Sequence, residues 1–257
     1  MSTRGLRVAF VGKGGAGKSA VAGTFARVLA RRRPVLAIDS DPMPGLAFTL
    51  GVPVVDAPIP DEAVLERAEG EDGPRFRLRP GLSAGAAVEQ YAALGPDGVR
   101  FLQFGKLRGP AWGLARSQSA FRQIVAELDE DSWSIVGDLP GGTRQPFFGW
   151  GAFARTVLVV VEPTAKSLLS ARRLARLALA EPPPERLVAV ANKVRAPEDV
   201  DLVARRSGLE VVAAIPWDEA LGEAERRGLA PIDAVPDSAA VGAVTSLVDR
   251  LEEEWSG

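Results

Sequence analysis

The chain has 257 residues, of which 46% are hydrophobic and 25% are charged, as in an ordinary globular protein. Its net charge of −2 gives no overall attraction to nucleic acid or to an anionic membrane. Because cysteine and histidine are absent, disulfides, thiolate or imidazole metal ligands and a cysteine nucleophile are excluded, and any metal must be bound by oxygen atoms. We see neither a signal peptide nor an apolar stretch of the roughly 20 residues that span a bilayer, and therefore expect a cytoplasmic protein.

The first feature along the chain is a glycine-rich loop between a predicted strand at residues 6–11 and a predicted helix at residues 20–30. It matches the pattern of a glycine, four residues and Gly-Lys-Ser/Thr. The loop and the next residue are Gly12, Lys13, Gly14, Gly15, Ala16, Gly17, Lys18, Ser19 and Ala20. Backbone N–H groups in such a loop bind phosphate oxygens, so we predict a nucleotide site here. Lys18 would bind the β- and γ-phosphates, and the Ser19 hydroxyl would bind Mg²⁺.

Two strand ends carry aspartates that the same site can use. A second predicted strand, residues 34–38, is followed by Asp39, Ser40 and Asp41, and a strand at 132–137 is followed by Asp138. The carboxyl ends of parallel strands line the ligand crevice, which would bring these carboxylates to the phosphates. We expect Asp138 to hold Mg²⁺ through a coordinated water, whereas turns built from Asp and Pro are the alternative at both places.

Residues 51 to about 118 form a glycine-rich variable insert that predicts little regular structure apart from a short helix at 61–69 and a strand at 76–79. After it, the pattern predicts a helix at 117–128 and the most apolar strand at 156–161. An amphipathic helix at 165–180 should turn Leu168, Leu169, Leu174, Leu177 and Ala178 inward.

The last third of the chain adds a strand at 186–191 that ends at Asn192 and Lys193, then a strand at 210–215 that ends at Pro216. An asparagine at such a place can bind an adenine edge and a lysine stem can cover its face, but a plain turn is equally consistent. Asp218 has an equally strong alternative as the N-cap of a following helix. Helices are predicted at 199–207 and 238–255, the second with an acidic end.

Strands that alternate with helices predict an α/β fold, a single domain over residues 1–257 with a mostly parallel sheet and helices on both faces. The motifs resemble the MinD/ParA class of P-loop ATPases over residues 7 to about 229, with Lys13 as the extra lysine of its deviant Walker A loop. The resemblance implies an ATP-dependent homodimer in which Lys13 reaches the facing subunit's nucleotide. It also implies that Asp41 positions the attacking water and that Asn192 and the Pro216-x-Asp218 segment border the adenine.

Within that class the sequence most resembles the CooC-like branch, which serves carbon monoxide dehydrogenase maturation. The segments that carry this resemblance are Glu-Pro-Thr at 162–164 and Ile-Pro-Trp-Asp at 215–218. That branch carries a nickel-binding Cys-x-Cys pair, for which this chain has residues 108–113 without cysteine. We therefore do not expect this chain to bind nickel in that way.

We expect a slow ATPase that uses ATP/ADP and Mg²⁺, with Lys13, Lys18 and Asp41 as its catalytic residues. It would act as a molecular switch on a client protein such as a metalloenzyme or an assembly factor, without stable membrane or nucleic-acid association. Alternatives are a MinD/ParA-type positioning ATPase on DNA or membrane, for which the arginines at 31–33 and 172–176 leave room, and an ATP-dependent ligase of the dethiobiotin synthetase type.

Overall fold

The computed structural model describes residues 4–40, 45–53, 59–68, 72–103, 111–141, 151–178 and 183–256, with side chains from 115 in the fifth range and to 255 in the last. The strands are β1 Arg7–Gly12, β2 Val35–Asp39, β3 Val64–Glu66, β4 Phe76–Leu78, β5 Ala93–Leu94, β6 Arg100–Gln103, β7 Ser134–Asp138, β8 Thr156–Val161, β9 Arg186–Val194 and β10 Val211–Pro216. The helices are α1 Lys18–Ala30, α2 Leu46–Leu50, α3 Ala84–Tyr91, α4 Ala111–Glu127, α5 Ala165–Ala178, α6 Pro197–Ser207, α7 Glu219–Arg226, α8 Pro231–Ala234 and α9 Ala239–Ser256, with 3₁₀ turns at Asp61–Ala63 and Pro96–Gly98.

One twisted sheet runs through the molecule in the order β10-β9-β8-β1-β7-β2-β6-β5. Its strands pair in parallel except for the short edge strand β5, which is antiparallel to β6. The order reverses on either side of β1, because β1 lies between β8 and β7. A crevice opens at such a switch point beyond the carboxyl ends of the strands, and the glycine loop follows β1 there.

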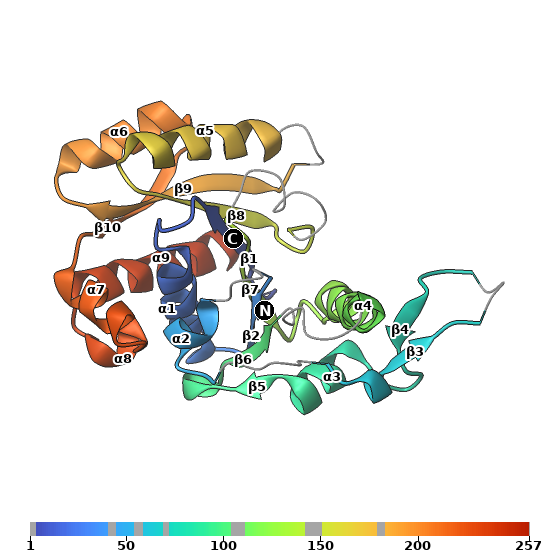
Figure 1. The fold of residues 1–257 in the computed structure, drawn as a ribbon. Helices are drawn as coiled ribbons and strands as arrows, with labels where there is room; N and C mark the ends of the chain where they lie inside the picture. The colour runs from blue at the N-terminus through green and yellow to red at the C-terminus, as the bar shows by residue number, and fades with distance from the viewer. Residues whose placement is uncertain are drawn as a thin grey trace.

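Helices cover both faces of the sheet, as predicted (Figure 1). The alternation of side chains along β1 shows the division: Val8 and Phe10 pack with α1 and α9, whereas Ala9 and Val11 pack with α5. At β7, β2 and β6 the second face is covered by α3 and α4, where Phe121, Ile124 and Val125 of α4 and Leu128 just after it are buried. The central strands are therefore apolar on both sides.

The region from 51 to 118 is more ordered into the sheet than its sequence indicates. It supplies β6, which pairs with β2 from Leu36↔Arg100 to Asp39↔Gln103, and α3 above it. The predicted helix at 61–69 is wrong within the described residues, because only a 3₁₀ turn forms before β3. The β3–β4 ribbon, whose second strand matches the predicted strand at 76–79, projects from the body of the molecule beside α4 (Figure 1).

The far end of α1 is anchored by a buried arginine. The Arg27 guanidinium donates to both carboxylate oxygens of Asp233 on α8 at 2.8 Å, and its Nε donates to Asp97 at 2.6 Å. Burial disfavours the charge, but these bonds outweigh it and raise the pKa of Arg27 above its ordinary value. The three-way contact joins α1, the turn at Pro96–Gly98 and α8.

None of the helices in the described part of the chain combines the length and the apolar character that a membrane span needs.

Candidate functional site: a glycine loop and an adjoining cavity

The glycine loop adopts the backbone that its sequence requires. Gly15 and Gly17 have φ values of 84° and 87°, in the left-handed region that glycine enters at no steric cost. The Ala16 N–H donates to the Lys13 carbonyl at 3.1 Å, which closes the turn before α1 begins at Lys18. At Gly12 a β-carbon would lie 2.5 Å from the Val160 carbonyl oxygen, so β8 passes too close to the loop for any side chain there.

Two side chains from β9 bind the carbonyl groups of this loop. The Asn192 amide Nδ2 donates to the Ala16 carbonyl at 2.8 Å, and the Lys193 ammonium donates to the Gly15 carbonyl at 2.8 Å. Lys193 also forms an ion pair with Glu162 at the end of β8. Its φ of 59° is uncommon for a residue other than glycine. With two carbonyls already bonded, the loop keeps its N–H groups as the donors that an anion would meet.

The opposite side of the loop brings together the predicted magnesium residues. The Ser19 hydroxyl, in the first turn of α1, donates to the Asp138 carboxylate at 2.5 Å. Asp39 lies on the neighbouring strand and accepts the N–H groups of Gly45 and Leu46 at 3.1 and 3.0 Å. A hydroxyl and a carboxylate are the hard oxygen ligands that Mg²⁺ prefers, so this pair fits the ion. Within the ranges that the structure covers, no cluster of three acidic side chains forms a larger metal site.

The two loop lysines differ in their surroundings. Lys18 is buried, and its ammonium lies close to Gly141 in the segment that follows Asp138. A β-carbon added to Gly141 would lie 3.6 Å from the Lys18 ammonium. Lys13 is partly exposed, and its ammonium donates to the neighbouring Gly14 carbonyl at 3.2 Å, its one side-chain hydrogen bond among the described residues. Lys18 is thus directed into its own site, whereas Lys13 stays at the surface of the loop. Asp41, the predicted water-positioning residue, lies outside the described residues.

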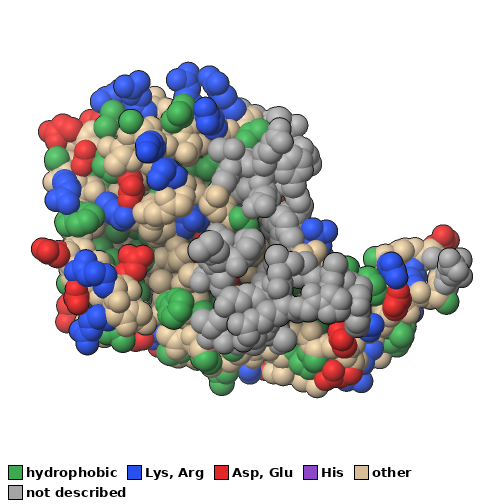
Figure 2. Space-filling model, viewed as in Figure 1, with side chains coloured by type: hydrophobic (Ala, Val, Ile, Leu, Met, Phe, Trp, Pro, Cys, Tyr) green, Lys and Arg blue, Asp and Glu red, His purple; other side chains and the backbone are tan. Residues whose placement is uncertain are grey.

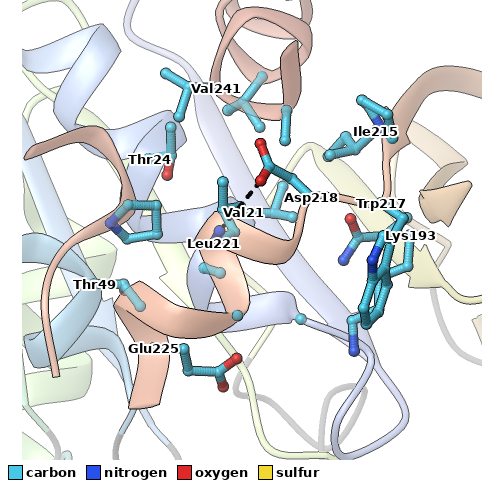
Figure 3. A pocket seen from close by; sticks show the side chains of 18 of the residues that line it. Val21, Thr24, Thr49, Lys193, Ile215, Trp217, Asp218, Leu221, Glu225 and Val241 are labelled. Atoms are coloured by element: carbon cyan, nitrogen blue, oxygen red, sulfur yellow. Dashed lines mark hydrogen bonds between the residues drawn. The ribbon is translucent and has the colours of Figure 1, made fainter. Parts of the chain in front are cut away.

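A cavity continues from the start of α1 toward α7 and α9, and Figure 3 shows the side chains that line it. The predicted residues Asn192, Lys193, Pro216 and Asp218 all line it, together with Gly17 and Ala20 from the loop and first helical turn. Apolar side chains of α1, α7 and α9 form much of the remaining wall, among them Val21, Leu221, Val241 and Val244. A largely apolar pocket that opens beside a phosphate loop suits a planar base.

The structure brings the predicted residues together but assigns two of them further contacts. Asp218 is the N-cap of α7, because its carboxylate accepts the N–H groups of Ala220 at 2.8 Å and Leu221 at 3.4 Å. Asn192 donates one amide hydrogen to the loop carbonyl of Ala16, and its contact with adenine stays a prediction. Trp217, for which the sequence predicts no role, lines the cavity with the Arg195 guanidinium 4.2 Å from the centre of its ring. No role was predicted for Glu162 either, although a carboxylate at the end of the central strand was the available signal.

The chain is similar to known proteins in sequence and in fold. The model of the CobQ/CobB/MinD/ParA nucleotide binding domain matches residues 8–232. The carbon monoxide dehydrogenase accessory protein CooC of Rhodospirillum rubrum is 28% identical over 90% of this chain and 91% of its own length. An uncharacterized ATP-binding protein of Methanocaldococcus jannaschii is 27% identical over 87% of this chain and 90% of its own. The septum site-determining protein MinD from Pyrococcus horikoshii, complexed with Mg-ADP, shares the fold at a TM-score of 0.67 and 18% identity, covering 97% of both chains.

Proposed function

Since the chain belongs to the CobQ/CobB/MinD/ParA nucleotide-binding family, we propose that it hydrolyses ATP as a switch that acts on a client protein. Mg-ATP would bring two copies together, and hydrolysis would let them separate. The observation that carries the proposal is the loop itself: Lys18 is buried beside it and the Ser19 hydroxyl lies 2.5 Å from Asp138. This arrangement neutralises and orients a triphosphate, which is most of what phosphoryl transfer requires of a protein.

Each residue has a defined role in this proposal. The loop N–H groups and Lys18 would bind the phosphates. The Ser19 hydroxyl would be an oxygen ligand of Mg²⁺ and Asp138 would hold the ion through a coordinated water, so that the ion offsets charge that develops on the phosphate oxygens. Asp41 would orient the attacking water, and Lys13 would bind the nucleotide of the second copy. Asn192 and Lys193 keep the loop in position from outside, so catalysis is positioning and charge neutralisation without a covalent intermediate.

Similarity to one relative supports an accessory role toward another protein. The relative at 28% identity is an accessory protein for carbon monoxide dehydrogenase, and this supports an accessory role here. The chain cannot bind nickel through thiolates, because it has no cysteine. The arginines at 31–33 give less support to the DNA alternative than their sequence indicates. Arg31 pairs with Asp97, and Arg32 pairs with Asp249 and Glu252, so these two cations are largely neutralised within the chain.

Calorimetry and steady-state hydrolysis together test the proposal. We expect wild type to bind Mg-ATP and to show a specific activity that rises with protein concentration, because two copies share each active state. Lys18→Ala should lose binding. Lys13→Ala should keep binding but lose the rise, since among the described residues the Lys13 ammonium bonds to its own loop and would be used only by the second copy. Absence of binding by wild type, or equal binding by Lys18→Ala, would refute the nucleotide site; a flat specific activity would refute dimerisation.

A further inference from the structure

The outer face of α5 carries a cluster of exposed cations with no ion pair among the described residues. Lys166, Arg172, Arg173 and Arg176 are all exposed, and Leu169 between them is 52% exposed. At about 100° per residue the four cations fall within an arc of roughly 120° centred on Leu169. The prediction that Leu169 turns inward is therefore wrong, because it lies opposite the buried Leu168, Ala171 and Leu174. Figure 2 shows Lys and Arg side chains gathered along this edge, where Figure 1 places α5 and α6.

Helix stability does not explain this face. Lys166 lies in the first turn, where the helix dipole disfavours a cation, and α5 has no acidic residue. Arg172 and Arg176 are one turn apart with like charge, which also destabilises a helix. Only Arg176, in the last turn, is placed where a cation helps. Within the part of the chain that the structure describes, none of the four cations has an ion pair or side-chain hydrogen bond.

The arginine cluster at the end of α1 differs from the α5 face in having acidic partners within the chain. Arg31 and Arg32 are bonded to Asp97, Asp249 and Glu252, so that cluster is satisfied by its own chain. The α5 face has no such intramolecular partner among the described residues. Its cations thus remain available for carboxylates or phosphates outside the chain.

The same helix is joined to the nucleotide site through its first turn. The Ser167 hydroxyl accepts the Glu162 N–H at 3.0 Å, and the Glu162 carboxylate pairs with Lys193. Lys193 in turn binds the Gly15 carbonyl of the glycine loop at 2.8 Å. Three contacts therefore connect α5 to the glycine loop, which suits a partner whose binding depends on nucleotide.

We propose that the cationic face of α5, meaning Lys166, Leu169, Arg172, Arg173 and Arg176, docks an acidic, leucine-bearing segment of a protein partner. Charge complementarity sets the sign of the partner, and the exposed leucine at the centre favours a protein, since apolar centres with arginine around them are typical of protein interfaces. Nucleic acid fits less well: Lys166 to Arg176 spans only about 15 Å along the helix, room for a few phosphates, on a chain whose net charge is −2. The identity of that partner as the client rests on the proposed function, whereas the docking itself does not.

The test uses the full chain and a fluorescein-labelled synthetic helical peptide with glutamates at i, i+3, i+4 and i+7 around two leucines, followed by fluorescence anisotropy at physiological ionic strength. We expect Arg172→Glu/Arg173→Glu/Arg176→Glu to weaken binding at least about tenfold, and Leu169→Ser to weaken it severalfold. The matched control is Arg205→Glu/Arg206→Glu, which reverses two exposed cations on the neighbouring α6 and should leave binding unchanged. A peptide with glutamine for glutamate should bind weakly to all forms.

Further probes decide between partners. A short duplex DNA, or vesicles with an anionic phospholipid, that bind more tightly than the peptide and lose binding in the α5 triple variant would overturn the protein partner. No peptide binding, or equal binding by the α5 and α6 variants, would overturn the docking surface. The α5 variant should keep wild-type Mg-ATP hydrolysis. Intact docking without hydrolysis would contradict only the proposed function, and intact hydrolysis without docking only this inference.

Discussion

Replacement of Asn192 by alanine distinguishes two ways in which this residue can serve nucleotide binding. The side chain is 7% exposed and donates at 2.8 Å to the carbonyl of Ala16, a residue that is 1% exposed. Alanine leaves that carbonyl without a donor where water has little access. An unsatisfied buried group costs about 1–3 kcal/mol, and roughly 1.4 kcal/mol is tenfold in affinity. If the whole cost falls on the bound loop conformation, affinity for Mg-ATP should decrease roughly 5- to 150-fold.

The assay is isothermal titration with Mg-ATP and, separately, with Mg-tripolyphosphate, which has no base. If Asn192 acts by holding the loop, both ligands should lose affinity by the same factor. Trp217→Ala is the matched control, because Trp217 lines the cavity without a hydrogen bond to the loop, and it should weaken Mg-ATP alone. Unchanged tripolyphosphate affinity in Asn192→Ala would refute loop positioning and leave adenine recognition as the role.

Three other changes have defined outcomes. Glu162→Gln removes the charge that pairs with partly exposed Lys193, so the KM for ATP should rise roughly twofold to fivefold with little change in kcat; in Lys193→Met the same change should add nothing, and an additive effect would contradict the link. Gly17→Ala places a β-carbon 2.4 Å from Asn192 Nδ2 at a φ of 87°, and should lose Mg-ATP binding and several degrees of Tm, whereas Gly14→Ala, with open space around it, should keep its Tm. The hydrogen bond from Arg27 holds the pKa of Asp233 below its usual range. This contributes stability above the unfolded pKa of about 4 that is lost as pH falls through the lowered folded value. Asp233→Asn should therefore lower the urea midpoint at neutral pH, and its difference from wild type should shrink as the pH falls below about 4; a difference that stays constant with pH would contradict this.

Local signals identified the glycine loop and the strands around it because their pattern is short-range. A run of apolar residues, then glycines, then a lysine and a hydroxyl residue specifies strand, loop and helix within 25 residues or so. The same signal failed in the edge region. β6 is a four-residue strand whose pairing with β2 is decided by contacts over 60 residues apart, and no local periodicity marks it.

The site divides in the same way. The placement of Lys18, Ser19 and Asp138 at one edge of the sheet could be predicted, since each follows directly from a strand end or a helix start, while their roles stay predictions. The partners of the loop carbonyls could not be, because Asn192 and Lys193 meet Ala16 and Gly15 across 176 and 178 residues. Leu169 shows that helical spacing alone does not predict burial. Its apolar side chain at a helical spacing predicts a core position, yet other residues of α5 occupy the arc that faces the sheet.

By itself, the sequence determined the class of fold and the chemistry of the phosphate loop, because backbone conformation there depends on glycines that are adjacent in the chain. Only packing settles which donors hold that loop and which cations find a partner among the described residues, because both depend on distances between segments far apart in the chain. Arg32 and Arg172 look alike in the sequence; one lies against the acidic end of α9 and the other faces solvent.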